Sequence, residues 1–412
     1  MMFQKKLVVV AVAGALGAGA TGVAVAQTTA GNVQIYGRLY PEFTVAKSSG
    51  ATAGGASSST LGRTPFAPGA GDLKSRNSVD ASNSRIGFRG TENLGGGLNA
   101  IWQIETQVAV DSGASGLLAS RRSFVGLRGG FGTVRLGNMD TVYKDIGDPL
   151  GILGISSGNF VSMSNVIFSR VPFGTSSAGS FHLRRASSIF YDSPNFGGLQ
   201  LHAQYGPDEI RTGNLDADLW SVGASYKRGA LEASLAHEIH NDLFAGSNGA
   251  PAVANPTTGA GSVHSKDRST RLMVLYNFAS KAKVQVNVAT VEYTESGGVA
   301  GKFQEYKNNR WSLTWEQQWT GPWRTTVAYG NSSEGSCSLV GGAACTTNGL
   351  GGNMLTLGAD YSFSRRTKLF LLYAKLNNNS AAQLRNLENV SASQVAPGTD
   401  ITQYALGIRH DF

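Results

Sequence analysis

The chain has 412 residues, of which 41% are hydrophobic and 15% charged; 35 Lys and Arg against 27 Asp and Glu give a net charge of +8. This composition excludes a disordered chain, which would contain fewer hydrophobic residues. After residue 26 there is no run of 18 or more apolar residues, so the sequence predicts no membrane-spanning helix.

The first 26 residues have the pattern of a secretory signal peptide. Lys5 and Lys6 precede the apolar run LVVVAVAGALGAGA, and the small residues Ala-Val-Ala occupy positions 24–26. We therefore expect cleavage before Gln27, which would lower the net charge from +8 to +6. The alternative, an anchor helix, is disfavoured because glycines interrupt the run and no basic cluster follows it.

Hydrophobic and polar residues alternate along most of the remaining chain, as expected for strands with two different faces. The clearest segments are VQIYGRLY (33–40), SRIGFRG (84–90), GLNAIWQIETQV (97–108), LQLHAQY (199–205) and AKVQVNVATVEY (282–293).

The connections between these segments alternate in length. Seven are short: ENLGGG, GGFG, SPNFGG, KRGA, SKAK, TGPW and FSRRTK. Eight are long: 44–82, 111–119, 138–183, 206–216, 241–266, 295–306, 331–349 and 379–399. Seven short turns between eight long loops require 16 strands in an antiparallel meander, which is typical of a bacterial outer-membrane β-barrel.

The last strand shows which solvent the apolar face meets. Tyr404, Leu406 and Ile408 alternate with small or polar residues, and the chain finishes on Phe412. In a bilayer every backbone polar group needs a partner, so a spanning sheet must close and turn its apolar face to lipid. A soluble β-sandwich is the competing interpretation, but one core could not cover sixteen such faces.

Several segments together resemble the trimeric general porins of Gram-negative bacteria, in the neisserial and β-proteobacterial branch. They include VQIYGRLY, SRIGFRGTENLGGGLNAIWQIET, RRSFVGLRGGFGTVRLGN, VYKDIGDP, FYDSPNFGGLQLHAQY, YSFSRRTKLFLLYAKLNN and YALGIRHDF. The sequence departs from this family at Tyr40, where many relatives carry an aspartate, and in the insert at 48–62. The resemblance implies a homotrimer in the outer membrane, in contact with lipid and lipopolysaccharide.

The third long loop, residues 138–183, is too apolar to extend into water and should pack inside the barrel. The resemblance likewise implies that this loop folds inward and narrows the channel. Its acidic residues would then lie at the constriction, with one lysine among them: Asp140, Lys144, Asp145 and Asp148.

Arginines on the opposite phase from the lipid-facing residues should line the lumen. A strand advances about 3.3 Å per residue, which places four of them near mid-barrel on neighbouring strands: Arg38, Arg85, Arg122 and Arg135. Arg89 and Arg128 lie nearer the short turns and should line the periplasmic exit.

A basic wall opposite an acidic loop predicts a passive channel for small hydrophilic solutes that prefers anions. Two other interpretations stay open within this fold. Carboxylates such as Glu105 could neutralise the arginines, or the arginines could form a selective site for organic acids or phosphate.

Functions of other classes have weaker support. GISSG (154–158) fits a nucleophile motif but lies within a loop, and His237 and His240 fall on opposite faces of a strand. We expect no enzyme, cofactor, metal or nucleic-acid partner; an adhesin that uses the long loops is the alternative without a channel. Cys337 and Cys345, in an exported chain, should form a disulfide within one loop.

Overall fold

The computed structural model describes residues 33–51, 75–81, 83–114, 116–155, 159–169, 171–172, 181–207, 217–243, 264–297, 300–301, 303–386 and 396–412. The predicted signal peptide, residues 1–26, lies outside the described residues. No helix within these ranges is long and apolar enough to cross a membrane.

In the described ranges, nineteen strand segments form one sheet, and all their pairings are antiparallel. The first nine are β1 Gln34–Leu39, β2 Glu42–Ser49, β3 Arg76–Asp80, β4 Arg85–Gly95, β5 Leu98–Gln107, β6 Ser123–Gly129, β7 Gly132–Asp140, β8 Arg184–Asp192 and β9 Leu199–Pro207. The others are β10 Asp218–Arg228, β11 Leu231–Asn241, β12 His264–Asn277, β13 Ala282–Ser296, β14 Phe303–Gln318, β15 Trp323–Ser332, β16 Ser336–Leu339, β17 Gly352–Ser362, β18 Thr367–Asn378 and β19 Asp400–Asp411.

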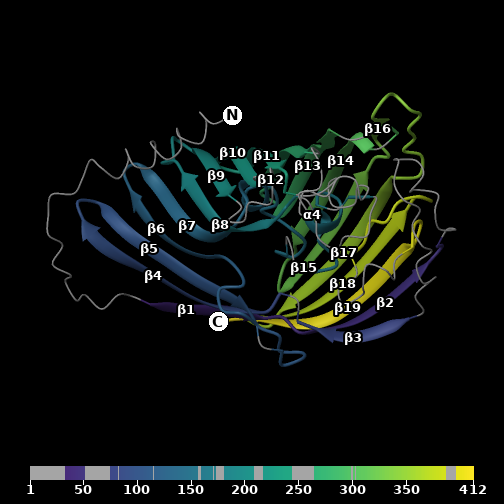
Figure 1. The fold of residues 1–412 in the computed structure, drawn as a ribbon. Helices are drawn as coiled ribbons and strands as arrows, with labels where there is room; N and C mark the ends of the chain where they lie inside the picture. Colours follow the sequence, from purple (N-terminus) through teal and green to yellow (C-terminus); the bar gives the residue numbers. More distant parts are fainter. Residues whose placement is uncertain are drawn as a thin grey trace.

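These nineteen segments make sixteen strands of a closed barrel, as predicted. β1 and β2 are halves of the first strand, β3 and β4 are halves of the second, and the short β16 lies in the loop between β15 and β17. Both halves of the first strand pair with β19, which closes the wall shown in Figure 1.

The interruptions of the first two strands lie beside each other. Pro41 follows β1 and cannot donate a backbone hydrogen bond, so the ladder breaks there. The neighbouring Tyr40 N–H donates instead to the Ser84 hydroxyl, at 2.8 Å, between β3 and β4. The first long loop is shorter than predicted, because the alternating pattern of Phe43 and Val45 continues the strand to Ser49.

The two faces of the barrel differ as the alternation predicts. The outward-pointing side chains of the last strand are about half exposed: 46% for Tyr404, 52% for Leu406 and 45% for Ile408. Phe412 is 41% exposed, and its ring packs over Gly37 of β1, where a Cβ atom would lie 2.3 Å from Cζ of the ring. The inward-pointing Gln403 and Ala405 are buried.

The third long loop, between β7 and β8, folds into the barrel and fills part of its interior. Its described part contains two one-turn helices, α3 Val142–Asp145 and α4 Met163–Val166, and Figure 1 shows α4 enclosed by the strands. The apolar residues of its middle part, between Ile152 and Phe168, form one buried cluster with inward-pointing residues of the wall, among them Ala289, Ala328, Met354 and Leu372. Burial of this apolar surface stabilises the folded-in loop, and we call this loop the constriction loop.

Candidate functional site

A cavity of about 360 Å³ remains between the constriction loop and the wall formed by the early strands. Its cationic lining residues are Arg38, Arg85, Arg89, Arg121, Arg122, Lys144 and Arg184. Its acidic lining residues are Glu105, Asp140, Asp145 and Asp148. Among the described lining residues, seven cations against four anions leave an excess of three positive charges around this space.

Two arginines of the cavity occupy directly opposite positions in the sheet. Arg38 of β1 and Arg85 of β4 are cross-strand partners, an arrangement in which like charges repel. Arg38 donates from Nε to Asp411 Oδ1 at 2.8 Å. Arg89, four residues further along β4, donates to Gln34 Oε1 at 2.9 Å and lies over the Tyr36 ring.

Glu105 of β5 offsets part of the positive charge. Its carboxylate accepts from Arg121 Nε at 2.6 Å and from the Tyr36 hydroxyl at 3.1 Å. Arg85 Nε lies 3.6 Å away, within ion-pair distance only. One carboxylate therefore serves two arginines, so neutralisation by Glu105 is partial.

Asp140, the last residue of β7, is a second shared carboxylate. It accepts from Arg184 Nε at 3.0 Å, and Lys144 Nζ and Arg122 Nη2 lie at 3.2 and 3.4 Å. Arg122 also forms an ion pair with Asp145 of α3. The acids at the start of the constriction loop thus contact the basic wall directly and do not face it across an open gap.

Lys144 lies deepest in this group, with 12% of its side chain exposed. Burial lowers the pKa of its ammonium group, and the carboxylate of Asp140 only partly offsets that effect.

The remaining predicted site residues lie elsewhere. Arg135 points inward but pairs with Asp192 and stacks on the Phe190 ring, apart from the cavity lining. Arg128 is exposed beyond the lining, whereas Arg89 belongs to it. Asp148 touches the cavity, but its oxygens accept from Ser164 Oγ, Gln285 Nε2 and the Gly151 N–H.

Two arginines of the cavity, Arg121 and Arg184, were not predicted from the sequence. Arg121 lies two residues before β6 and Arg184 is the first residue of β8, and each is the first residue of an Arg-Arg pair, at 121–122 and 184–185. A doubled arginine at the junction of loop and strand is a signal that could have identified them.

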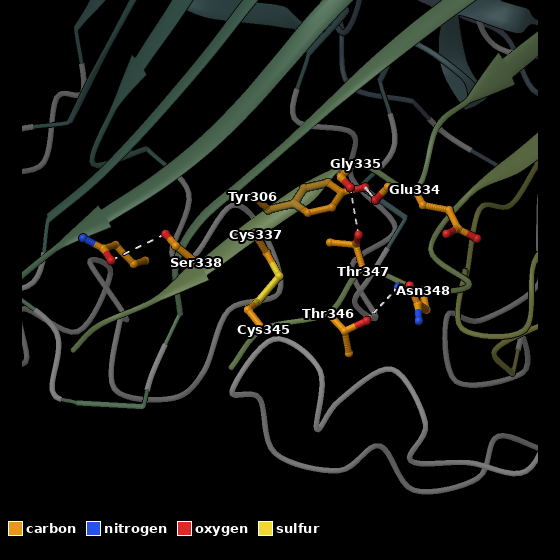
Figure 2. Close-up of a disulfide and its surroundings, with 10 residues drawn as sticks. Tyr306, Glu334, Gly335, Cys337, Ser338, Cys345, Thr346, Thr347 and Asn348 are labelled. Carbon is orange, nitrogen blue, oxygen red and sulfur yellow. Dashed lines mark hydrogen bonds between the residues drawn. A yellow bond between two sulfur atoms is a disulfide. The ribbon is translucent and has the colours of Figure 1, made fainter. Parts of the chain in front are cut away.

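The predicted disulfide is present on another loop. Cys337 of β16 and Cys345 are bonded across eight positions, with their Cα atoms 5.9 Å apart. Figure 2 shows the bridge beside Tyr306, whose hydroxyl donates to the Glu334 carbonyl at 3.0 Å. The Thr347 hydroxyl donates to the Gly335 carbonyl at 2.8 Å, so a hydrogen bond as well as the disulfide connects the two arms of this loop.

A family model described as Gram-negative porin matches residues 9–381. Among curated proteins, the chain is 32% identical to the major outer membrane protein P.IB of Neisseria lactamica over 167 residues, 40% of this chain and 45% of that protein. It is 35% identical to the protein of the same name from Neisseria gonorrhoeae over 155 residues, 37% of this chain and 40% of that protein. The matched region thus spans less than half the length of these relatives.

Solved structures extend the likeness of fold over almost the whole chain. An anion-selective porin from Comamonas acidovorans superposes with a TM-score of 0.67 at 24% identity, covering 93% of this chain and all of that one. The trimer form of in-vitro folded OmpT from Vibrio cholerae gives a TM-score of 0.59 at 14% identity, with 93% and 100% covered. At these identities the likeness concerns the fold.

Proposed function

The chain belongs to the Gram-negative porin family, and on this premise we propose that it is a passive diffusion channel for small hydrophilic solutes and ions, with a preference for anions. The family and the closed barrel place the protein in the outer membrane of a Gram-negative bacterium. They are the family and fold of channels and not of enzymes.

The observation that carries the anion preference is the excess of three positive charges around the cavity. Guanidinium groups stay charged at any physiological pH, and a narrow space between low-dielectric walls concentrates their field. Anions therefore gain a favourable potential where the constriction loop narrows the barrel, and cations meet a barrier. The Comamonas acidovorans protein, described as anion-selective, has the same fold.

The proposed assembly is a homotrimer embedded in outer-membrane lipid and lipopolysaccharide. The support comes from the family and from the trimer form recorded for a protein of the same fold. The exposed apolar side chains of β19, such as Leu406 and Ile408, offer a surface that either lipid or a neighbouring barrel can cover.

The deciding measurement is the reversal potential of single channels in a planar bilayer under a KCl gradient. An anion-preferring channel gives a potential with the sign of the chloride equilibrium potential. The opposite sign would remove the anion preference, and a protein that folds and inserts without conducting would remove the channel itself in favour of an adhesin.

A solute-selective channel of the same fold is the second candidate, because Arg38 and Arg85 hold like charges opposite each other beside open space. A carboxylate or phosphate between them would relieve that repulsion. Chloride current that is blocked by millimolar organic acid or phosphate, with saturation, would favour this candidate. Current that rises in proportion to salt and is insensitive to these solutes favours general diffusion.

A further inference from the structure

The last long loop, between β18 and β19, also folds into the barrel mouth. In its described part, residues 379–386 and 396–399, the side chains of Leu384, Arg385 and Asn386 are at most 6% exposed. Such burial is unusual for a loop at the rim of a barrel. The segment must therefore contact protein on both of its sides.

On one side, the amide side chain of Asn378, at the end of β18, forms hydrogen bonds with the loop. Asn378 Nδ2 donates to the carbonyls of Leu384 and Thr399, at 2.8 and 2.7 Å. Asn378 Oδ1 accepts from the Leu384 N–H at 2.8 Å. The Asn378 side chain thus joins the outgoing and returning arms of the loop to the barrel wall.

On the other side the same segment contacts the constriction loop. The Gln383 N–H donates to the Pro172 carbonyl at 2.7 Å, and Asn386 Nδ2 donates to the Phe160 carbonyl at 3.0 Å. Leu384 is fully buried in the apolar cluster that also contains Phe160 and Val161. These contacts join positions more than 200 residues apart in the sequence.

We propose that residues 379–386 form a positioning element for the outer arm of the constriction loop, the part that contains Phe160 and Pro172. By holding this arm in place, the element fixes the width of the pore. The barrel wall contacts the same segment, since Asn159 Nδ2 donates to Glu42 Oε1 at 2.6 Å and Thr356 Oγ1 donates to the Val161 carbonyl at 3.3 Å. Residues 379–386 add a second support at Phe160 and Pro172, and without it this segment should move more within the lumen. The effect on the pore rests on the proposed channel function, whereas the docking itself does not.

The test uses the full-length protein and the variant Asn378→Ala, which removes three hydrogen bonds without changing any residue of the cavity or the constriction loop. Asn377→Ala is the matched control, because Asn377 bonds instead to Asn353 Oδ1 of the neighbouring strand. A second variant, Leu384→Ala, removes the apolar contact with the cluster. Two readouts apply: tryptic cleavage after Arg385, located by mass spectrometry, and single-channel current noise.

Arg385 is 6% exposed, so trypsin should cut after it slowly in the wild type. We expect cleavage there to be at least ten-fold faster in Asn378→Ala and in Leu384→Ala, with the Asn377→Ala rate close to that of the wild type. The same two variants should show current noise at least twice that of the wild type.

Wild-type cleavage after Arg385 as fast as in the variants would overturn the docking. Faster cleavage with unchanged noise and conductance would overturn the role in fixing the pore. Absence of any conductance, in the wild type as well, would overturn the channel function while the cleavage data still decided the docking.

Discussion

Arg38 of the first strand donates from Nε to Asp411 of the last strand at 2.8 Å, at the seam where the barrel closes. Arg409 Nε donates to the other oxygen of the same carboxylate, also at 2.8 Å. Asp411 therefore offsets the charges of two neighbouring arginines at the seam.

Replacement of Asp411 by Asn should weaken the seam. Each hydrogen bond between charged groups contributes about 1.5–3 kcal/mol when well shielded, and this carboxylate is partly exposed, so we expect a loss of about 1–3 kcal/mol. The measurement is equilibrium unfolding of the barrel in urea. His410→Asn, on the outward phase of the same strand, is the control and should change stability little; equal effects of the two variants would contradict the role of the ion pair.

Glu105 and Arg85 should influence ion selectivity in opposite directions. Glu105→Gln would raise the excess of cavity charge from three to four, and Arg85→Gln would lower it to two. Reversal potentials under a KCl gradient should therefore shift toward stronger anion preference in the first variant and away from it in the second.

The control for these two variants is Lys227→Gln, which removes one positive charge outside the cavity from a side chain that is 69% exposed. Solvent and salt screen a charge in that position, so its shift should be the smallest of the three. Shifts of the same sign for Glu105→Gln and Arg85→Gln would show that local charge at the cavity does not set selectivity.

Lys144 should make the proposed anion preference depend on pH. Burial lowers the pKa of its ammonium group below the ordinary value of 10.5. A lysine is charged only below its pKa. As pH rises, Lys144 therefore loses its positive charge at a lower pH than an exposed lysine does. As pH rises toward the range in which exposed lysines titrate, anion preference should therefore fall, measured as reversal potential against pH. Lys144→Arg should keep its preference over that range, and an identical decline in this variant would exclude Lys144 as the group responsible.

The barrel was predictable because its signal is local. Each strand's alternation fixes which side chains meet lipid, so Leu406 and Ile408 could be placed from the sequence. The partners of inward side chains could not, since they depend on cross-strand register. Arg135 has the inward phase that was predicted. The register, however, places it two residues from Thr133, the cross-strand partner of Asp192, and Arg135 forms an ion pair with Asp192. The docking of Gln383 on Pro172 joins distant loops and has no local pattern at all.

The disulfide between Cys337 and Cys345 should stabilise its own loop and not the barrel. In the chain-entropy view, closure of so short a loop contributes about 2–3 kcal/mol. This contribution should be confined to residues 333–349 and to the end of β14 that pairs with β16, because β15 and β17 pair with each other independently of the bridge. Reduction should raise amide hydrogen exchange in that loop and leave exchange in β15 and β17 unchanged. Faster exchange in both strands would mean that the bridge supports the wall.

The outward face should tolerate charge poorly where it meets hydrocarbon. Leu371 is 56% exposed and lies near the middle of β18, opposite Leu406 of β19. An arginine at the centre of the lipid face of such a barrel costs about 2–4 kcal/mol, so Leu371→Arg should lower the free energy of unfolding in lipid vesicles by that amount. Leu117→Arg is the matched control, because Leu117 is 84% exposed in a loop beyond β5. If the two variants were equally stable, the apolar face of β18 would not lie against hydrocarbon, and either a neighbouring subunit or water would have to cover it.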